Sequence, residues 1–274
     1  MINAVSAWQG MAPLLARAAW APGYWALDLH CPEVARTAVP GQFVHLRVAG
    51  PDLLLRRPIS IHEVDGDRIT LVVAVVGTGS QWLANRSEGE ELDLIGPLGQ
   101  RGLSFEPGAR TVALVGGGVG IPPLHFLATR RPADGPRLVA FIGARSEARL
   151  LGLDNFAAQG CEVVVSTDDG SRGFLGTNVA ALADYAKHTR IDQVLACGPT
   201  PMMRAAALWA IEHGIPSQVC LEARMGCGVG ACLSCVVETR REGWDRYLRV
   251  CTEGPVFDGD NIVWETLSPM VKLD

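Results

Sequence analysis

The sequence predicts a protein of the α/β plus all-β class, with an antiparallel β-barrel, a doubly wound parallel α/β domain and a small C-terminal loop domain. Short apolar runs separated by turn residues extend from about residue 5 to 105, and strand–glycine–helix alternation begins after Pro107-Gly108. Four cysteines then crowd between Cys227 and Cys251 in a stretch with little periodicity. These changes of pattern divide the chain into predicted domains at residues 1–106, 107–221 and 222–274.

The first domain has the pattern of a barrel because its apolar runs are short, rich in Val, Ile and Leu, and closed by Gly or Asp. Turn signals such as Pro40-Gly41 and Asp65-Gly66 separate these runs, and no long helical period interrupts them. A helix start is expected only at residues 80–85. The clearest strands are residues 42–48, 57–64 and 68–76.

The N-terminal 27 residues are rich in Ala, Leu and Trp, but Pro13, Arg17 and Pro22 interrupt them. No small-residue cleavage pattern follows a basic start, and no apolar run reaches the length of a bilayer crossing. We therefore expect neither a signal peptide nor a membrane span.

The second domain alternates strands with helices, which predicts a parallel sheet. Apolar runs at residues 111–115, 137–142, 162–166 and 193–196 are each followed by helical spacing. Residues 217–221 supply a fifth strand.

Composition and charge exclude several classes of protein. Hydrophobic residues make up 48% of the 274 and charged residues 19%, which describes a folded chain and not a disordered or fibrous one. The formal net charge is −5 and the basic residues are scattered, so nucleic acid is not an expected partner.

The distribution of the eight cysteines along the chain is typical of a protein with a metal site and not of a disulfide scaffold. Four lie close together near the C-terminus. The other four, Cys31, Cys161, Cys197 and Cys220, lie far apart among apolar neighbours, where we expect buried thiols. This distribution suggests metal binding in a reducing cytoplasm.

The spacing of Cys227, Cys232, Cys235 and Cys251 is the most specific feature of the sequence. Four, two and fifteen residues separate successive cysteines, and the first three match the spacing of plant-type [2Fe-2S] ligands. Glycines between these ligands would let backbone N–H groups point at the sulfur atoms. Structural zinc is the alternative, but zinc sites favour short ligand pairs on both sides, and here the last cysteine stands alone.

Two short motifs in the barrel together favour an FAD site. Arg57-Pro58-Ile59-Ser60 offers a guanidinium for a phosphate and a hydroxyl for a flavin edge, with a rigid proline between them. Gly77-Thr78-Gly79-Ser80 ends a strand and opens a helix, so free N–H groups and the helix dipole can face a pyrophosphate. Taken singly, the first motif is better explained by a surface arginine and an ordinary strand residue, and the second is equally consistent with a turn that has Ser80 as N-cap.

Two glycine-containing loops in the second domain predict a nicotinamide site. The run from Val115 to Pro123 follows the first strand and leads into a helix, so a dinucleotide phosphate can approach bare backbone, although the glycines lack the Rossmann spacing. Cys197-Gly198-Pro199 repeats the arrangement after the fourth strand. The expected contacts in the first loop are Gly116, Gly117, Gly118 and Gly120.

Two observations bear on the chemistry of this site. Asp168 and Asp169 follow the third strand, where their carboxylates would disfavour the extra phosphate of NADP, but turn chemistry explains them equally well. The histidines show no ligand pairing at helical spacing and no Ser/His/Asp arrangement can be argued, so we assign no catalytic acid or base.

With these residues in view, the chain resembles the ferredoxin-reductase superfamily and, within it, the electron-transfer subunits of B-type dihydroorotate dehydrogenases. The resemblance covers nearly the whole chain. It is carried by the order of the motifs Pro40-Gly41-Gln42-Phe43-Val44, Arg57-Pro58-Ile59-Ser60, Gly116 to Pro123, Cys197-Gly198-Pro199, the four cysteines, and Gly254-Pro255-Val256-Phe257.

The resemblance implies an NAD-dependent oxidoreductase component of pyrimidine biosynthesis. The barrel would hold FAD, the second domain would bind NAD(H), and the cysteine loop would hold a [2Fe-2S] cluster facing an FMN-containing catalytic subunit, in a heterotetramer with two copies of each. Implied FAD contacts are Arg57 to Ser60, Val72, Val73, Ala74, Gly79 and Ser80. Similar subunits usually offer an aromatic or basic residue on the strand before the glycine pair, so contacts from Val72 to Ala74 would be backbone or apolar.

Two alternatives remain open from the sequence. One is the small subunit of an NADH- and ferredoxin-linked oxidoreductase, a hydrogenase or a sulfide dehydrogenase, which shares this architecture. The other is a non-enzymatic interaction module with zinc in the cysteine loop. A partner subunit that carries FMN would argue against the first alternative, and a larger partner with [4Fe-4S] clusters would argue for it. A colourless, zinc-containing protein would support the second.

Overall fold

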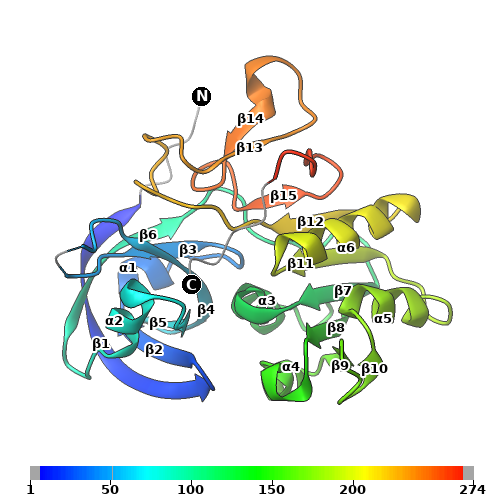
Figure 1. Cartoon of the computed structure of the whole chain (residues 1–274), viewed down its shortest axis with the longest axis horizontal. Coiled ribbons are helices and arrows are strands. Elements are labelled where there is room, and N and C mark those ends of the chain that lie inside the picture. Colours follow the sequence, from blue (N-terminus) through cyan, green and yellow to red (C-terminus); the bar gives the residue numbers. More distant parts are fainter. Residues whose placement is uncertain (1–6, 51, 268–274) are drawn as a thin grey trace.

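The computed structural model describes residues 7–50 and 52–267, and it consists of a closed barrel, a seven-stranded sheet flanked by helices, and a small hairpin region above both (Figure 1). The predicted barrel and doubly wound sheet are confirmed. Residues 1–6 of the predicted first domain and 268–274 of the third lie outside the described residues. The exact boundaries between the domains stay predictions.

Six antiparallel strands close the barrel in the order β1-β2-β5-β4-β3-β6. Side chains alternate between inside and outside with the two-residue period of a strand, so that Leu27 and Leu29 of β2 and Ile69 and Leu71 of β5 are fully buried. The strands are β1 (Trp8–Ala21), β2 (Tyr24–His30), β3 (Phe43–Leu46), β4 (Arg57–Asp65), β5 (Arg68–Ala74) and β6 (Glu91–Leu98); helices α1 (Pro32–Ala35) and α2 (Thr78–Ala84) lie between them.

The segment with the interrupted apolar pattern near the N-terminus is strand β1. It pairs with β2 and with β6, and register shifts near Leu14 and Ala19 bend it around the barrel. The longest helix in the described part of the chain has 13 residues, and none there is long and apolar enough to cross a membrane.

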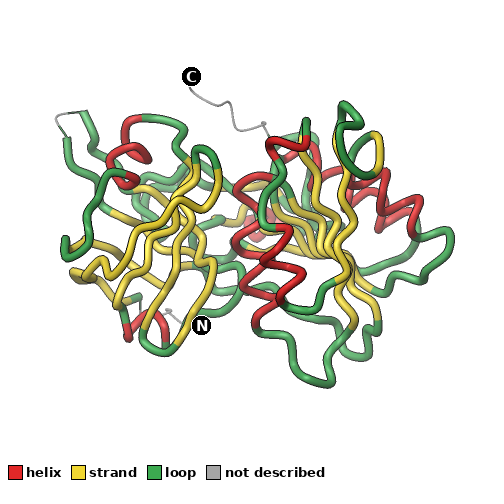
Figure 2. Tube along the Cα trace, turned by 90° about the horizontal axis from the view of Figure 1, so that it is seen from below, coloured by secondary structure: helices red, strands yellow, loops and turns green. Residues whose placement is uncertain are grey.

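The sheet has the order β10-β9-β8-β7-β11-β12-β15, parallel except for β15. The barrel strands and the sheet strands form two neighbouring groups (Figure 2). The strands are β7 (Thr111–Gly116), β8 (Arg137–Ala144), β9 (Glu162–Thr167), β10 (Phe174–Leu175), β11 (Gln193–Cys197), β12 (Ser217–Cys220) and β15 (Val256–Asp258).

Helices cover both faces of this sheet, which explains its continuous apolar runs. Val112 and Leu114 of β7 belong to one buried cluster with residues of α3 (Ile121–Thr129) and α4 (Leu153–Ala158). Ala113 and Val115 belong to another with residues of α5 (Asn178–Tyr185) and α6 (Thr200–Glu212). Helix α3 also packs on the barrel, because Phe126 is buried in the barrel core.

The C-terminal region contacts both the barrel and the seven-stranded sheet. Its hairpin of β13 (Val236–Glu238) and β14 (Tyr247–Arg249) stands above them (Figure 1), while β15 pairs antiparallel with β12 and completes the sheet. Arg101, after the barrel, forms an ion pair with Asp258 of β15, with Nη1 to Oδ2 at 2.8 Å. These strands are too short for the sequence pattern to predict them.

Candidate functional site

The hairpin β13–β14 closes the fifteen-residue gap between the last two predicted ligands. Val236 pairs with Arg249, and the Val250 N–H donates to the Cys235 carbonyl at 3.0 Å. Cys235 and Cys251 are therefore adjacent and buried, and their thiols are within hydrogen-bond contact. This contact lowers the pKa of Cys235 to about 6 and raises that of Cys251.

The loop before the hairpin wraps its backbone around Cys227. The N–H groups of Val229, Ala231 and Cys232 approach Cys227 Sγ at 3.4, 3.2 and 3.4 Å. This is possible because Gly228 and Gly230 have φ of +73° and +83°, which side chains rarely tolerate. Backbone donors around a thiolate are what an iron–sulfur ligand requires.

Cys232 is the exposed member of the set. Its sulfur lies 3.2 Å from the Ser234 hydroxyl and accepts from the Cys227 N–H at 3.4 Å. The Ser234 contacts, led by the hydroxyl, lower the pKa of Cys232 to about 6. The thiolate, which is the form that binds metal, is thus favoured at neutral pH.

Arg249 fixes the glycine loop to the hairpin. Its Nη1 donates to the Gly230 carbonyl at 2.9 Å, and its Nε donates to Glu253 Oε2 at 3.0 Å. The Glu253 carboxylate partners the guanidinium, so Arg249 acts here mainly as an anchor. The four thiols, the backbone donors and this anchor together fit an iron–sulfur cluster.

The two predicted FAD motifs meet in the barrel. The guanidinium of Arg57 on β4 lies directly over Gly79 at the start of α2, where a Cβ would be 2.5 Å from Arg57 Nε and 2.7 Å from Nη2. The Arg57 Nη1 group also donates to the Leu55 carbonyl at 2.5 Å. A cation is thereby held beside the first-turn N–H groups of α2, and this cradle suits a pyrophosphate.

Ser80 closes the turn of this loop. Its hydroxyl accepts from the N–H groups of Val76 and Gly77 at 2.9 and 3.1 Å and donates to the Gly77 carbonyl at 2.9 Å. The N-cap of α2 is Gly77, not Ser80. Ser80 therefore shapes the loop, whatever further contact it makes with a cofactor.

The other predicted flavin residues divide between the inside and the outside of the barrel. Ile59 and Val73 pack into the barrel core, so only their backbones can face a flavin. Ser60 pairs with Phe43, a residue outside that core, and thus lies on the outer face together with Pro58. Val72 and Ala74 alternate with Val73 and belong to the outer face of β5.

The two predicted nicotinamide loops contact each other at the carboxyl edge of the sheet. Gly116 of β7 pairs with Cys197 of β11, and the Gly117 N–H donates to the Cys197 carbonyl at 3.4 Å. A Cβ on Gly120 would overlap this carbonyl, and one on Gly198, whose φ is +149°, would lie 2.8 Å from Gly117 O. Backbone approaches this close require glycine, and they leave the edge bare for a dinucleotide.

The acidic pair after β9 takes part in a turn. Asp169 Oδ1 accepts from the N–H and the hydroxyl of Ser171 at 3.0 and 2.6 Å, and these contacts lower its pKa. Turn chemistry accounts for Asp169 without a cofactor.

Sequence reasoning missed Tyr24 and Glu222, which lie beside the nicotinamide loops. The Tyr24 hydroxyl faces Gly118, where a Cβ would be 4.0 Å away. Glu222 is exposed as a residue, but the protein around its carboxyl group desolvates that group and raises its pKa. The negative charge of Glu222 in turn contributes to raising the pKa values of Tyr24 and Cys197. Tyr24, Glu222 and Cys197 therefore lie near one another where the barrel meets the sheet. Glu222 follows the fifth strand at the same sheet edge as Cys197, a position that the topological rule identifies.

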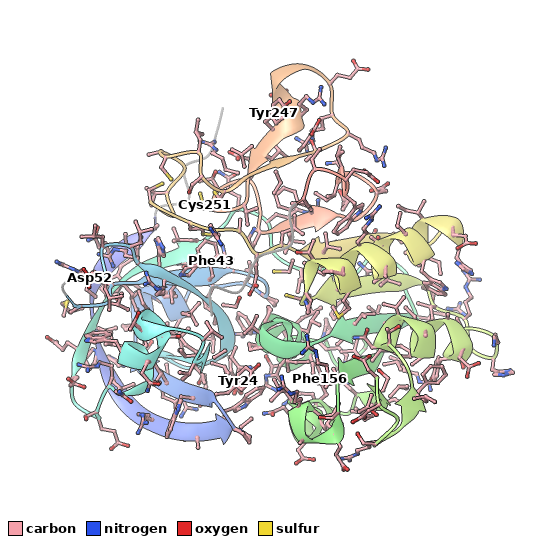
Figure 3. All side chains as sticks on the ribbon, viewed as in Figure 1. Tyr24, Phe43, Asp52, Phe156, Tyr247 and Cys251 are labelled. Carbon is pink, nitrogen blue, oxygen red and sulfur yellow. The ribbon has the colours of Figure 1, made fainter. Side chains whose placement is uncertain are left out.

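Aromatic rings pack between the barrel and the second domain near Tyr24. His62 of β4 stacks on His125 of α3 with centroids 4.3 Å apart, and Trp20 packs on His62. Tyr24 and Phe156 approach from the two sides (Figure 3). Burial lowers the pKa of His62 to about 3, so its ring is neutral at this interface.

The outer face of β3 separates the predicted flavin strand from the cysteine loop. Phe43 belongs to the same buried cluster as Cys235 and Cys251, and it lies near Cys251 in Figure 3. His45, two residues further, is fully buried beneath Gly228. The two predicted cofactor sites therefore share a short boundary.

Comparison with known proteins identifies the cysteine region. A family model described as the iron-sulfur cluster binding domain of dihydroorotate dehydrogenase B matches residues 222–263. This span contains all four cysteines, so the predicted C-terminal iron–sulfur domain is confirmed.

Curated relatives match over most of their length. The dihydroorotate dehydrogenase B (NAD(+)), electron transfer subunit, of Desulforamulus reducens is 40% identical over 248 residues, which is 89% of this chain and 94% of that protein. The protein of the same name from Shouchella clausii is 37% identical over 260 residues, which is 93% of this chain and 98% of that protein.

Solved structures support the fold. The structure of an NADH-dependent reduced ferredoxin-NADP oxidoreductase superposes with a TM-score of 0.82 at 29% identity, covering 94% of this chain and 91% of that chain. A ferredoxin NADP+ reductase from Neisseria gonorrhoeae with bound FAD and NADP superposes with a TM-score of 0.61 at 17% identity, covering 75% and 92%. The second similarity concerns the fold alone.

Proposed function

The chain belongs to the family of electron-transfer subunits of dihydroorotate dehydrogenase B, and we propose from this that it passes electrons between NAD(H), FAD and a [2Fe-2S] cluster on their way to a catalytic partner subunit. The resemblance expected from the sequence is confirmed by these relatives. The observation that carries the proposal is the set of four cysteines inside the matched iron–sulfur segment, with three backbone N–H groups around Cys227 Sγ.

Bound FAD would accept or release hydride as an electron pair, and the cluster would carry single electrons. The protein's own groups bind and orient. Arg57 and the start of α2 hold the phosphates of FAD, and Pro58 and Ser60 present the outer barrel face to its ring. Cys227, Cys232, Cys235 and Cys251 hold the cluster.

The second domain supplies the loops for the nicotinamide cofactor. The bare backbones of Gly116 to Gly120 and of Gly198 would receive the dinucleotide, while Tyr24 and Glu222 border the place where it meets the flavin. The stacked rings of His62 and His125 hold the second domain against the barrel. NAD is the expected dinucleotide, as in the names of the relatives.

The partner would carry FMN and bind the pyrimidine, with two copies of each subunit in a cytoplasmic complex. Support for a docking site near the cluster comes from the exposure of Cys232 and of its apolar neighbours Val229 and Leu233, which are 50% and 60% exposed. Leu233 also has a φ of +59°, so the loop holds this side chain outward in a backbone conformation that leucine rarely adopts.

A Cys232→Ser variant, co-purified with the FMN subunit, tests the route. NADH should still bleach the flavin, because Cys232 does not touch the barrel site, while NADH-linked turnover of orotate should be lost. A Cys161→Ser variant is the matched control, since that thiol is buried away from the cluster loop. Retained orotate turnover in Cys232→Ser would contradict the proposed route.

The similarity to the ferredoxin-linked oxidoreductase favours one second candidate, the small subunit of an NADH- and ferredoxin-linked enzyme. Co-purification from the native cell separates the two. An FMN-carrying partner supports the dihydroorotate assignment, and a larger partner with [4Fe-4S] clusters opposes it.

A further inference from the structure

His45 lies between the strand with the predicted flavin residues and the loop with the cluster cysteines. It pairs with Pro58 of β4, just as Phe43 pairs with Ser60. Paired residues of antiparallel strands point to the same face, so His45 shares the outer face of the barrel with Pro58 and Ser60. Its neighbours Val44 and Leu46 point the other way, into the barrel core.

The cluster loop covers the other side of the imidazole. Gly228, which follows Cys227, packs so closely on the ring that a Cβ there would overlap Nδ1 and lie 3.0 Å from Cε1. Its φ of +73° also favours glycine. The His45 side chain is completely buried by this contact. One ring thus touches the backbone of the iron–sulfur loop on one side and neighbours the flavin strand on the other.

Both ring nitrogens of His45 are buried and lack a hydrogen bond of ordinary geometry among the described residues; backbone groups of Cys227 and Arg56 are its nearest polar neighbours, and they oppose the lowering of its pKa by burial. Buried polar atoms in folded proteins are nearly always paired in good geometry, so a better partner than these backbone groups is expected when the loop holds its cluster. A neutral imidazole carries one N–H donor. The loop that covers the ring is built to hold sulfur atoms, which accept such donors.

We propose that His45 is a positioning residue of the iron–sulfur site, whose ring donates an N–H to a sulfur of the bound cluster and fixes the loop against the flavin strand. The inference rests on the proposed cluster at the four cysteines. A hydrogen bond to a cluster sulfur stabilises the more negative, reduced state and raises the reduction potential. The ring itself carries neither the electron nor a transferred proton.

The test measures the cluster potential in the full chain by redox titration monitored by electron paramagnetic resonance. His45→Phe fills the space without a donor and should lower the potential by the equivalent of about tenfold in the cluster equilibrium, which is about 59 mV for a one-electron couple. His45→Gln restores a donor and should recover part of the shift. His125→Phe is the control, because His125 is equally buried but lies at the interface of α3 with the barrel.

If a variant fails to fold, the hydrogen bond can still be tested in the wild-type protein. Protein labelled with ¹⁵N-histidine should show a weak ¹⁵N coupling to the reduced cluster in pulsed paramagnetic resonance spectra. Absence of this coupling, or an unchanged potential in a cluster-loaded His45→Phe variant, would overturn the role of His45 alone. A wild type that binds no iron and sulfide would overturn the proposed function itself.

Discussion

The guanidinium of Arg57 lies against the backbone of Gly79, although the two residues belong to separate motifs on β4 and α2. The absence of a side chain at Gly79 creates the space that Arg57 occupies. One positive charge and one helix start therefore form a single anion cradle, in which neither element alone would suffice.

A Gly79→Ala variant should weaken FAD binding about 10- to 100-fold, because the new Cβ would displace Arg57 and remove a charge-assisted hydrogen bond worth about 1.5–3 kcal/mol. Quenching of flavin fluorescence measures the dissociation constant. Gly77→Ala in the same loop is the control, since nothing lies within 4 Å of its Cβ position. Equal affinities in the two variants would argue against the cradle.

A Ser234→Ala variant should raise the pKa of Cys232 in iron-free protein from about 6 toward the ordinary thiol range, because the hydroxyl contact at 3.2 Å is lost. The pH dependence of alkylation, followed at this cysteine by mass spectrometry, measures the change. Cys161 serves as an internal reference, since burial raises its pKa to about 11. An unmoved alkylation midpoint at Cys232 would show that Ser234 does not control the thiol.

Gly117→Ala and Gly120→Ala should separate dinucleotide binding from stability. A Cβ on Gly117 makes only ordinary contacts, the nearest at 3.4 Å from Met202 Sδ, whereas one on Gly120 overlaps the Cys197 carbonyl. Gly120→Ala should therefore lose about 1–3 kcal/mol of stability. Gly117→Ala should keep the melting temperature but bind NADH more weakly. NADH affinity equal to wild type in Gly117→Ala would place the dinucleotide elsewhere.

The neutral His62 ring at the domain interface predicts a loss of stability in acid. Its pKa is about 3 in the folded protein and about 6.5 unfolded, so the unfolded chain binds more protons between these values. The contribution of His62 to the free energy of unfolding is fully present above about pH 6.5 and falls below this pH, by about 2 kcal/mol at pH 5. Urea denaturation at pH 7 and pH 5 measures the difference. In a His62→Phe variant, the difference in unfolding free energy between pH 7 and pH 5 should be mostly lost. An unchanged pH dependence in this variant would exclude His62 as the cause.

Patterns with a clear physical period were predictable from the sequence. The strands found as β4, β5, β7, β8, β9 and β11 follow from runs of Val, Ile and Leu bounded by turns, because burial on one or both sheet faces demands them. The cysteine spacing likewise predicted the iron–sulfur region, since ligand geometry restricts the intervals. The contacts that bring Arg57 to Gly79 are long-range, so local patterns could indicate both motifs but not their meeting.

Residues with no distinguishing local pattern were not predictable. β1 mixes Pro13 and Arg17 into an apolar run because it changes partners from β6 to β2 along its length. His45 sits in an ordinary strand, and only the fold places Gly228 over its ring. Glu222 lies near Tyr24 and Cys197, which the fold and not the local sequence brings beside it.

An anaerobic visible spectrum of the purified chain, taken before and after NADH with iron, sulfide and flavin quantified, shows whether electrons pass from NADH through FAD to the cluster. We expect flavin bands and a reddish cluster absorbance that both bleach with NADH, with one FAD, two irons and two sulfides per chain for a [2Fe-2S] site on four thiolates. A colourless protein that contains zinc in place of iron and sulfide would contradict this electron path.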